Sequence, residues 1–483
     1  MTPAGSGEAM ASPGPVAVPR VWRALAVVAR WQLLLTRRHR MGLVLLFAVM
    51  ALCVGIRMWP ALGKPSMPDR EHAAIALRLL DATIARATVA PPAVATRPPA
   101  TRRGNPSKER AAPGYALVLY AAAVLDSAAA KAIECRALAT PCTGASMRTV
   151  LALQFVVVLA GLALVAAAAL QLSGSASVAL LTLLLAFVGS PLGEPASYPL
   201  PYVWPPALLF LFAYLLAASF ARRSAGLALL AGAALGSVAL FLPTMVIAVP
   251  LTALVLAFGL RRDGGEMATA VGHGVMLLAG AALVLVGALL LLIPSGIYDV
   301  SALLRGIAYD LALRTGFQSM GIGSAIAGVL LPLPVVGGVV ELLAPTLVQP
   351  FGAFVPGTFI TAGDSVIFRG ALAASPLASG QLSWLWSECV LGDLGGYLLS
   401  MPPMLMRGIF GNADLVGLIG LLHMRSLFVW HGVDRRMGAL AAIAAPFVLL
   451  LVLNTLLTAS LPFANVPLVF LYAYAIAYIA GRL

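Results

Sequence analysis

The chain has 483 residues, of which 61% are hydrophobic and only 10% are charged. Soluble proteins are about 45–50% apolar and about 25% charged, so this composition excludes an ordinary soluble globular protein. The formal net charge is +13, carried almost entirely by arginine. Because this charge is spread along an apolar chain, it argues against nucleic acid as a partner and favours anionic lipid head groups and phosphates.

Long apolar runs recur along the whole chain. A transmembrane helix needs about 20 such residues, and the continuity of the runs excludes a membrane β-barrel, whose strands alternate in short segments. We therefore expect an all-α polytopic membrane protein with about 10–13 transmembrane helices and a large first extracytoplasmic loop.

The N-terminal region is basic and then becomes apolar. Residues 1–40 are expected to form a cytoplasmic tail and a basic amphipathic helix on the membrane, and residues 41–62 to form the first transmembrane helix. The positive-inside rule then places the N-terminus in the cytoplasm and the polar stretch 63–147 outside. Loops longer than about 60 residues cross largely regardless of charge, so the arginines of this loop do not reverse the assignment.

The middle of the chain, residues 148–294, is expected to consist of transmembrane helices. Alternating crossings bring Arg222-Arg223 and Arg261-Arg262 to the cytoplasmic side, as the positive-inside rule requires. The predicted spans are 148–171, 175–190, 201–221, 224–242, 244–260 and 268–293.

The C-terminal region, residues 295–483, is expected to combine transmembrane helices with outer loops. The first of these loops carries Arg305 and Arg314. The last three spans return the C-terminus to the cytoplasm, and the Ala/Gly/Arg/Pro-rich composition favours a bacterial inner membrane. These spans are 409–429, 437–457 and 462–481.

One part of this region has an undecided topology. Residues 318–345 are apolar but interrupted by Pro332 and Pro334. Because proline breaks or kinks a helix, this stretch fits either a bent helix or a re-entrant hairpin. The sequence leaves open how often residues 318–408 cross the membrane.

The polar loop 63–147 holds most of the groups able to do chemistry. The apolar spacing over residues 68–86 predicts an amphipathic helix with Asp69 and Glu71 at or near its start. Carboxylates there stabilise the helix dipole by about 0.3–1 kcal/mol and cap N–H groups, so capping explains them as well as catalysis does. Pro113-Gly114-Tyr115 then opens a short apolar run that we expect to dip into the membrane interface.

Two further features of this loop each allow a structural and a functional interpretation. Residues 88–112 are rich in proline, alanine and arginine, as in a solvated linker or a basic flap over a phosphate group. Cys135 and Cys142 either form a disulfide, which an extracytoplasmic location permits, or remain free thiols.

Three segments follow one another: a membrane helix with PDREHAAIALRLLD, then PGYALVLYAAAVLD, then spans containing GEPASYPL and GLALLAGAALGSVALFLPTMVIAVP. Over roughly the first 260 residues, this order resembles the GT-C superfamily of polyprenyl-phosphate-dependent glycosyltransferases. The likeness is greatest to the branch with the protein O-mannosyltransferases and the aminoarabinose transferase of lipid A. The resemblance implies a GT-C-like fold, with Asp69 at the acidic active-site position and Glu194 at a second acidic position. The chain departs from the family at His72-Ala73, where an aromatic residue is usual, and at Leu242-Pro243, where Arg-Pro is usual.

The implied function is the transfer of a sugar from a polyprenyl-phosphate-linked donor to a lipid, glycan or protein acceptor outside the membrane, with inversion. Such a reaction needs a carboxylate that accepts the proton of the acceptor hydroxyl, worth about 10²–10⁴-fold, and cations that stabilise the leaving phosphate. We predict Asp69 as the base, with Glu71 and Glu194 assisting it or holding Mg²⁺ or Mn²⁺. The predicted substrate- and phosphate-binding residues are Lys64, Arg70, His72, Tyr115, Arg305 and Arg314.

Two other functions compete with this interpretation. A transporter or lipid flippase would carry ionisable groups in the middle of its spans, whereas here the charges concentrate in loops. A polysaccharide polymerase or ligase of the O-antigen type has its large outer loop late in the sequence, whereas here the largest loop comes first. Both comparisons favour the transferase.

Overall fold

The computed structural model describes residues 37–62, 67–68, 70–87, 112–141, 144–189, 198–292, 311, 314, 321–352, 387, 390–410, 414–433, 436–457 and 466–482. Within these ranges the chain is helical and contains no strand. This confirms the predicted all-α class for the described part of the chain. The basic amphipathic helix expected near the N-terminus lies outside these ranges, and so do residues 88–111 of the segment 88–112.

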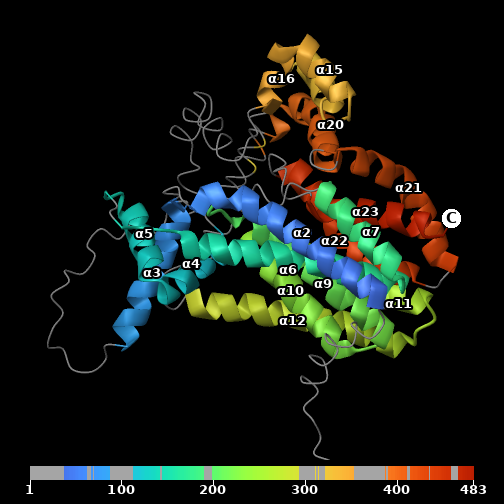
Figure 1. Cartoon of the computed structure of the whole chain (residues 1–483), viewed down its shortest axis with the longest axis horizontal. Coiled ribbons are helices and arrows are strands. Elements are labelled where there is room, and N and C mark those ends of the chain that lie inside the picture. The colour runs from blue at the N-terminus through green and yellow to red at the C-terminus, as the bar shows by residue number, and fades with distance from the viewer. Residues whose placement is uncertain are drawn as a thin grey trace, which may run out of the picture.

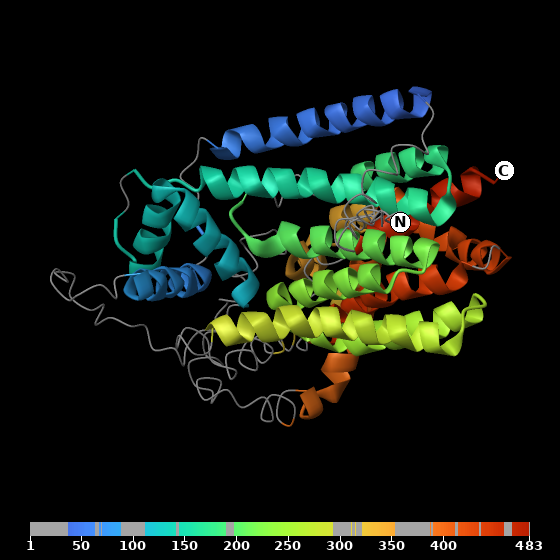
Figure 2. The same ribbon diagram turned by 90° about the horizontal axis from the view of Figure 1, so that it is seen from below.

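Most of the described residues form an elongated bundle of helices that lie side by side (Figures 1 and 2). Short 3-10 turns, η3 and η4, lead into two of these helices. The elements of the bundle are α2 (Arg37–Leu62), α6 (Arg148–Ser173), α7 (Ala176–Val188), η3 (Pro201–Val203), α9 (Trp204–Arg222), α10 (Ala225–Phe241), η4 (Pro243–Ile247), α11 (Ala248–Arg262), α12 (Met267–Leu292), α21 (Asp414–Val433), α22 (Met437–Leu457) and α23 (Val466–Ala480).

Seven helices of the described part are long and apolar enough to cross a bilayer, which identifies an integral membrane protein. They are Met41–Leu62, Arg148–Ser173, Pro201–Arg222, Pro243–Arg262, Met267–Leu292, Leu415–Gly432 and Met437–Leu457. Each overlaps a predicted span; the largest offset is at Leu415–Gly432, for which the predicted span is 409–429. The helices α7, α10 and α23 are also apolar, but they have only 13, 17 and 15 residues. The total of about 10–13 crossings therefore remains a prediction.

Close helix packing in the bundle depends on small residues, as is usual between membrane helices. The contact between α10 and α12 shows this best. A Cβ at Gly232 would lie 1.9 Å from the carbonyl oxygen of Leu277. Only glycine allows these two backbones to approach so closely.

The helix directions bring several arginines to one end of the bundle. Gln154 of α6 lies beside Leu200, and Gly161 lies beside Phe210 of α9, so α6 and α9 run in parallel. The last turn of α6 therefore lies at the same end as Arg222 and Arg223. There the Arg436 guanidinium donates to the carbonyl oxygen of Leu172 over 2.6 Å.

Arg261 and Arg262 lie at the same end, which we call the arginine end. The backbone N–H of Gly438, at the start of α22, donates to the Asp263 carboxylate over 3.2 Å, directly after those arginines. The predicted arginine pairs thus share one end of the bundle. That this end is cytoplasmic remains a prediction from the positive-inside rule.

Three helices form a separate unit at the opposite end of the bundle (Figure 1). They are α3 (Arg70–Ala87), α4 (Pro113–Leu125) and α5 (Ser127–Leu138), and we call them the three-helix unit. Its core contains Tyr115, Leu119 and Ile133, none of them exposed. A second contact joins Ile75 and Leu79 of α3 to Leu292, the last residue of α12. The amphipathic helix predicted over 68–86 is thus α3, and its apolar face packs on α4, α5 and the bundle.

The region of undecided topology contains short helices that stand away from the bundle beside α20 (Figure 1). Residues 331–335, with both prolines, separate α14 from α15, so a turn between two short helices replaces a continuous bent helix. The elements are α14 (Ile322–Leu330), α15 (Val336–Leu343), α16 (Pro345–Gly352) and α20 (Leu394–Phe410).

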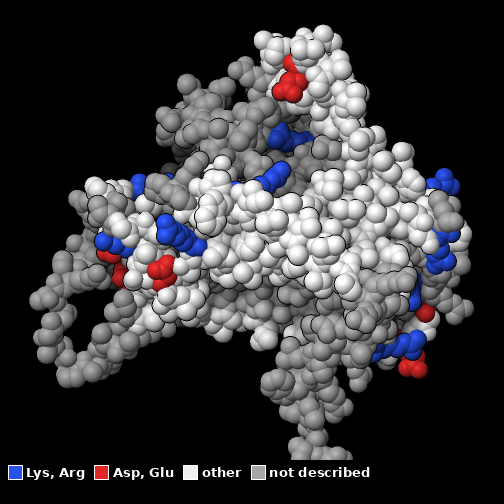
Figure 3. Space-filling view, viewed as in Figure 1, with Lys and Arg blue, Asp and Glu red and all other residues white. Residues whose placement is uncertain are grey.

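Charged side chains on the visible face gather mainly at the two ends of the molecule, with a broad apolar band between them (Figure 3). One group covers the three-helix unit and another covers the arginine end, and a few further charges lie near α20 and the short helices beside it. This distribution suits a chain whose middle lies in hydrocarbon, because charges are costly there. It also directs the search for a polar site to the three-helix unit.

Candidate functional site

The corner between α4 and α5 is fixed by Asp126, which caps α5. The Asp126 carboxylate accepts the backbone N–H of Ala128 over 2.8 Å and the hydroxyl of Thr149, the second residue of α6. The Thr149 hydroxyl, followed by the Ala128 N–H, holds the pKa of Asp126 below its ordinary value. This carboxylate therefore joins the three-helix unit to the bundle, and its role is structural.

The residues just before Asp69 are held by the end of α5. Pro68 is buried, and its carbonyl oxygen accepts the Nε–H of Arg136 over 3.0 Å. Met67 packs against the core of the three-helix unit. Asp69 and Lys64 themselves lie outside the described residues.

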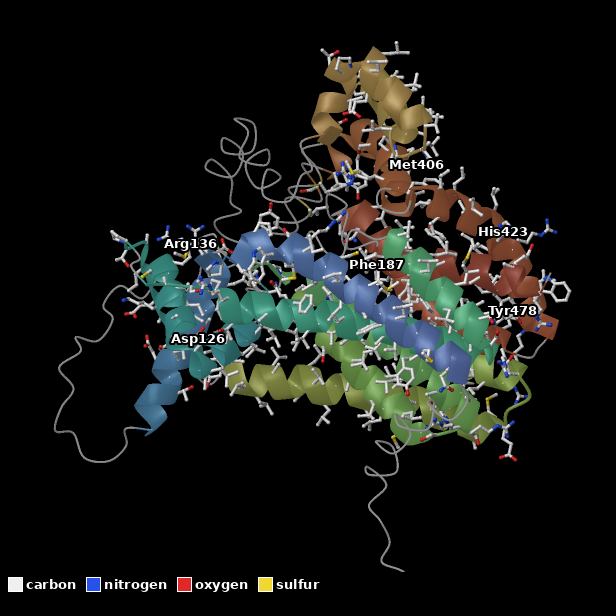
Figure 4. The ribbon with its side chains drawn as sticks, in the orientation of Figure 1. Asp126, Arg136, Phe187, Met406, His423 and Tyr478 are labelled. Carbon is white, nitrogen blue, oxygen red and sulfur yellow. The ribbon has the colours of Figure 1, made fainter. Side chains whose placement is uncertain are left out.

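A second arginine holds the other end of the same segment. The Nε–H of Arg148, the first residue of α6, donates to the carbonyl oxygen of Leu62, the last residue of α2, over 3.1 Å. Leu62 and Pro68, the described residues on either side of residues 63–66, are thus each held by an exposed arginine. Arg136 in the last turn of α5 and Asp126 at its start both lie on the three-helix unit, far from Tyr478 and His423 at the other end of the molecule (Figure 4). Sequence reasoning missed both arginines, because each contact joins residues 68 or 86 positions apart.

Three of the predicted site residues lie at the start of α3. Arg70 is exposed, whereas Glu71 and His72 are partly buried in the first turn. The His72 ring meets the fully buried Tyr115 ring edge-on, with 5.3 Å between centroids and an angle of 80°. The structure thus brings together two segments that the sequence separates by 43 positions. The place of Glu71 in a first helical turn also suits the capping interpretation.

Gly114 allows α4 to touch the end of α10. A Cβ on Gly114 would lie 2.8 Å from the Phe241 ring and 2.9 Å from the Leu240 carbonyl group. The Pro-Gly-Tyr segment therefore lies directly against the end of the glycine-rich span, next to Leu242-Pro243. The short apolar run predicted at the membrane interface is α4, and seven of its residues are buried.

After residues 190–197, which include Glu194, the described chain resumes at the same place. Glu194 lies outside the described residues, but Leu200, six residues later, accepts the Nε2–H of Gln154 over 2.6 Å. Trp204 then stacks on Phe241, with 6.0 Å between ring centroids and 8° between planes. Trp204 also packs against the core that contains Met67 and Tyr115. A glutamine inside an apolar span is a signal that could have identified Gln154 from the sequence.

Arg314 lies elsewhere, between α20 and α22, and is fully buried. Its guanidinium donates to the carbonyl oxygen of Thr455 over 2.8 Å and to the Ser400 hydroxyl over 2.7 Å. It also lies 4.7 Å from the centroid of the Tyr397 ring. These contacts use Arg314 to join two helices, so its predicted role at a phosphate stays a prediction. Arg305 lies outside the described residues.

The predicted disulfide and metal are not described by the structure. Cys135 is a buried free thiol whose Sγ lies 3.8 Å from the carbonyl oxygen of Pro141, and Cys142 lies outside the described residues. Among the described residues, no group of three or more His, Cys, Asp or Glu side chains could hold a metal ion. The Mg²⁺ or Mn²⁺ site, which would involve Asp69 or Glu194, remains a prediction.

Comparison of the chain with protein-family models, curated proteins and solved structures finds no match. The resemblance to GT-C transferases therefore rests on the motifs quoted above. What the structure adds is their mutual placement around Tyr115, Trp204 and Phe241.

Proposed function

We propose that this chain is a membrane glycosyltransferase that moves a sugar from a polyprenyl-phosphate donor to an acceptor outside the membrane. In the proposed reaction, the Asp69 carboxylate accepts the proton of the acceptor hydroxyl, and the hydroxyl oxygen attacks the anomeric carbon. The bond from that carbon to the phosphate oxygen breaks, and its electron pair leaves with the phosphate. One displacement inverts the configuration of the sugar.

One observation carries this proposal: motifs far apart in the sequence meet at one end of the bundle. Met67 before Asp69, Tyr115 of the Pro-Gly-Tyr segment, Trp204 after the Glu194 loop and Phe241 at the end of the glycine-rich span share one apolar cluster. A catalytic site assembled from several loops on a rigid helical frame needs this convergence. A set of unrelated membrane segments would not require it.

Cations at this end of the molecule suit the leaving phosphate. Arg136 and Arg148 use their Nε–H groups on carbonyl oxygens, so each guanidinium plane is fixed while its outer nitrogens extend from an exposed side chain. Fixed guanidinium groups bind phosphate in a bidentate manner and stabilise developing negative charge. Together with Arg70 they place three guanidinium groups at this end of the molecule, where a phosphate-releasing reaction needs cations.

Transport of an anionic lipid is the second candidate, and one observation favours it. Arg314 is buried against α20, and Ser400 and Arg407 lie seven residues apart on one face of that helix. Ionisable residues inside membrane segments often mark a pathway for ions or substrates. A transporter would need Arg314 and Arg407 but would not need Asp69.

Replacement of Asp69 by asparagine separates these two functions. We expect Asp69→Asn to abolish release of polyprenyl phosphate from polyprenyl-phosphoryl sugars, because the variant has no general base. Asp81→Asn, the same change at an exposed position of α3, is the matched control and should keep wild-type activity. Expression and membrane insertion should be equal in both variants. Full activity of Asp69→Asn would show that Asp69 is not the base.

A further inference from the structure

Two buried polar atoms next to the proposed site have no hydrogen-bond partner among the described residues. They are Oε1 of Gln154 on α6 and Nε1 of Trp204 at the start of α9. The Gln154 side chain is 0% exposed. Buried polar groups are nearly always hydrogen-bonded. Because these two atoms also lie beside the proposed site, a bound ligand suits them as a partner.

The orientation of the Gln154 amide follows from its one hydrogen bond. Its Nε2 donates to the carbonyl oxygen of Leu200. A carbonyl oxygen can only accept, so the amide nitrogen must face Leu200 and the amide oxygen must face away from it. The unpaired atom of Gln154 is therefore an acceptor, whereas the indole N–H of Trp204 is purely a donor. A sugar carries several hydroxyl groups, each of which both donates and accepts, and so it suits both atoms.

The surroundings of this pair resemble a ligand site more than a helix contact. Trp204 packs against the bundle core and also against the core of the three-helix unit. Its ring stacks on Phe241, and Tyr115 belongs to the same cluster. Small-molecule sites typically combine aromatic walls with a few placed polar groups, and aromatic rings bind the apolar faces of sugars.

We propose that Gln154 and Trp204 bind hydroxyl groups of the sugar carried by the glycosyl donor. This inference rests on the proposed function and deepens it. Arg136 and Arg148 bind the phosphate, and Gln154 and Trp204 bind the sugar on the bundle side of the same site. The hydrogen bonds orient the ring, so that its anomeric carbon is presented to the acceptor hydroxyl.

The test compares binding of lipids with and without a sugar. Purified protein in detergent is titrated with polyprenyl phosphate and with polyprenyl-phosphoryl-glucose, -mannose and -arabinose. Trp204→Phe keeps an aromatic ring and removes only the N–H donor. We expect it to raise the Kd of the tightest-binding sugar lipid about fivefold, the loss of one hydrogen bond of about 1 kcal/mol, and to leave the Kd of polyprenyl phosphate unchanged. Gln154→Leu should likewise raise the Kd of the sugar lipid and leave the Kd of polyprenyl phosphate unchanged.

Thr252→Val is the matched control. Its hydroxyl on α11 is also buried and has no hydrogen-bond partner among the described residues. The Kd values of this variant should equal those of the wild type for all four lipids.

The remaining outcomes overturn the inference in distinguishable ways. One such outcome is that Trp204→Phe lowers the Tm and leaves the Kd of the sugar lipid at the wild-type value. That result would show that a buried water, and no sugar, is the partner of the two polar atoms. Sugar lipids that bind no better than polyprenyl phosphate would show that no sugar subsite exists. Failure of the wild type to bind any of the four lipids would overturn the proposed function itself.

Discussion

Gly114 is the residue at which α4 touches α10, and Gly114→Ala tests that contact. The added Cβ would lie 2.8 Å from the Phe241 ring and 2.9 Å from the Leu240 carbonyl group. The ring can rotate, but the backbone of Leu240 cannot move without moving α10. Overpacking of this kind costs about 1–3 kcal/mol, and the higher helix propensity of alanine returns about 1 kcal/mol at most. We therefore expect a net destabilisation of up to about 2 kcal/mol.

The same substitution should lower activity. If α4 and α10 are forced apart, Tyr115 shifts relative to Trp204 and Phe241, and misplacement of a substrate-positioning group costs rate. A misplacement of about 1 Å costs about 10²-fold in rate. Because relief of contacts of 2.8–2.9 Å needs a smaller shift, we expect release of polyprenyl phosphate to fall about tenfold.

Gly272→Ala is the matched control, because no atom would lie within 4 Å of a Cβ on this α12 residue. Melting in detergent and the release assay are measured for both variants. We expect Gly272→Ala to equal or exceed the wild type in Tm, because alanine favours helix. A Gly114→Ala protein that melts at the wild-type temperature and keeps full activity would refute the close approach of α4 and α10.

Two further predictions concern the three-helix unit. Arg136→Gln should raise the Kd for polyprenyl phosphate about tenfold, because a charge-assisted hydrogen bond is lost. The control Arg261→Gln, at the arginine end, should leave this Kd unchanged. Equal effects of the two substitutions would exclude a specific phosphate contact. Asp126→Ala should lower the free energy of unfolding of the unit by about 1 kcal/mol at neutral pH, as measured by hydrogen exchange. Because the pKa of Asp126 is lowered in the folded state, its contribution is complete above the ordinary pKa and is lost as the pH falls through the folded pKa. Asp126→Asn should therefore flatten the acid loss of protection below about pH 4, and an unchanged pH profile would contradict the cap.

The bundle helices were predictable because hydrophobic length alone identifies a membrane span. The predicted spans at 148–171, 244–260 and 437–457 match α6, η4 with α11, and α22 closely. The turn at 331–335 was not predictable, because two prolines permit either a kink or a break and local sequence does not decide between them.

The site was only partly predictable, for a different reason. His72 and Tyr115 stood out by motif, and the structure places them in contact. Arg136 and Arg148 act on backbone oxygens of distant residues, and such contacts leave no local pattern. Asp126 ends an apolar run in the sequence, and only the packing of α5 on α6 shows that it accepts the Thr149 hydroxyl.

Mass spectrometry of lipid that co-purifies with the wild-type protein tests the central claim most directly. A transferase with fixed arginines around its donor site should retain polyprenyl phosphate or a polyprenyl-phosphoryl sugar through mild detergent extraction. Arg136→Gln should lose that lipid, and Arg261→Gln should keep it. A phospholipid retained equally by all three proteins, with no polyprenyl lipid, would contradict the transferase and favour transport.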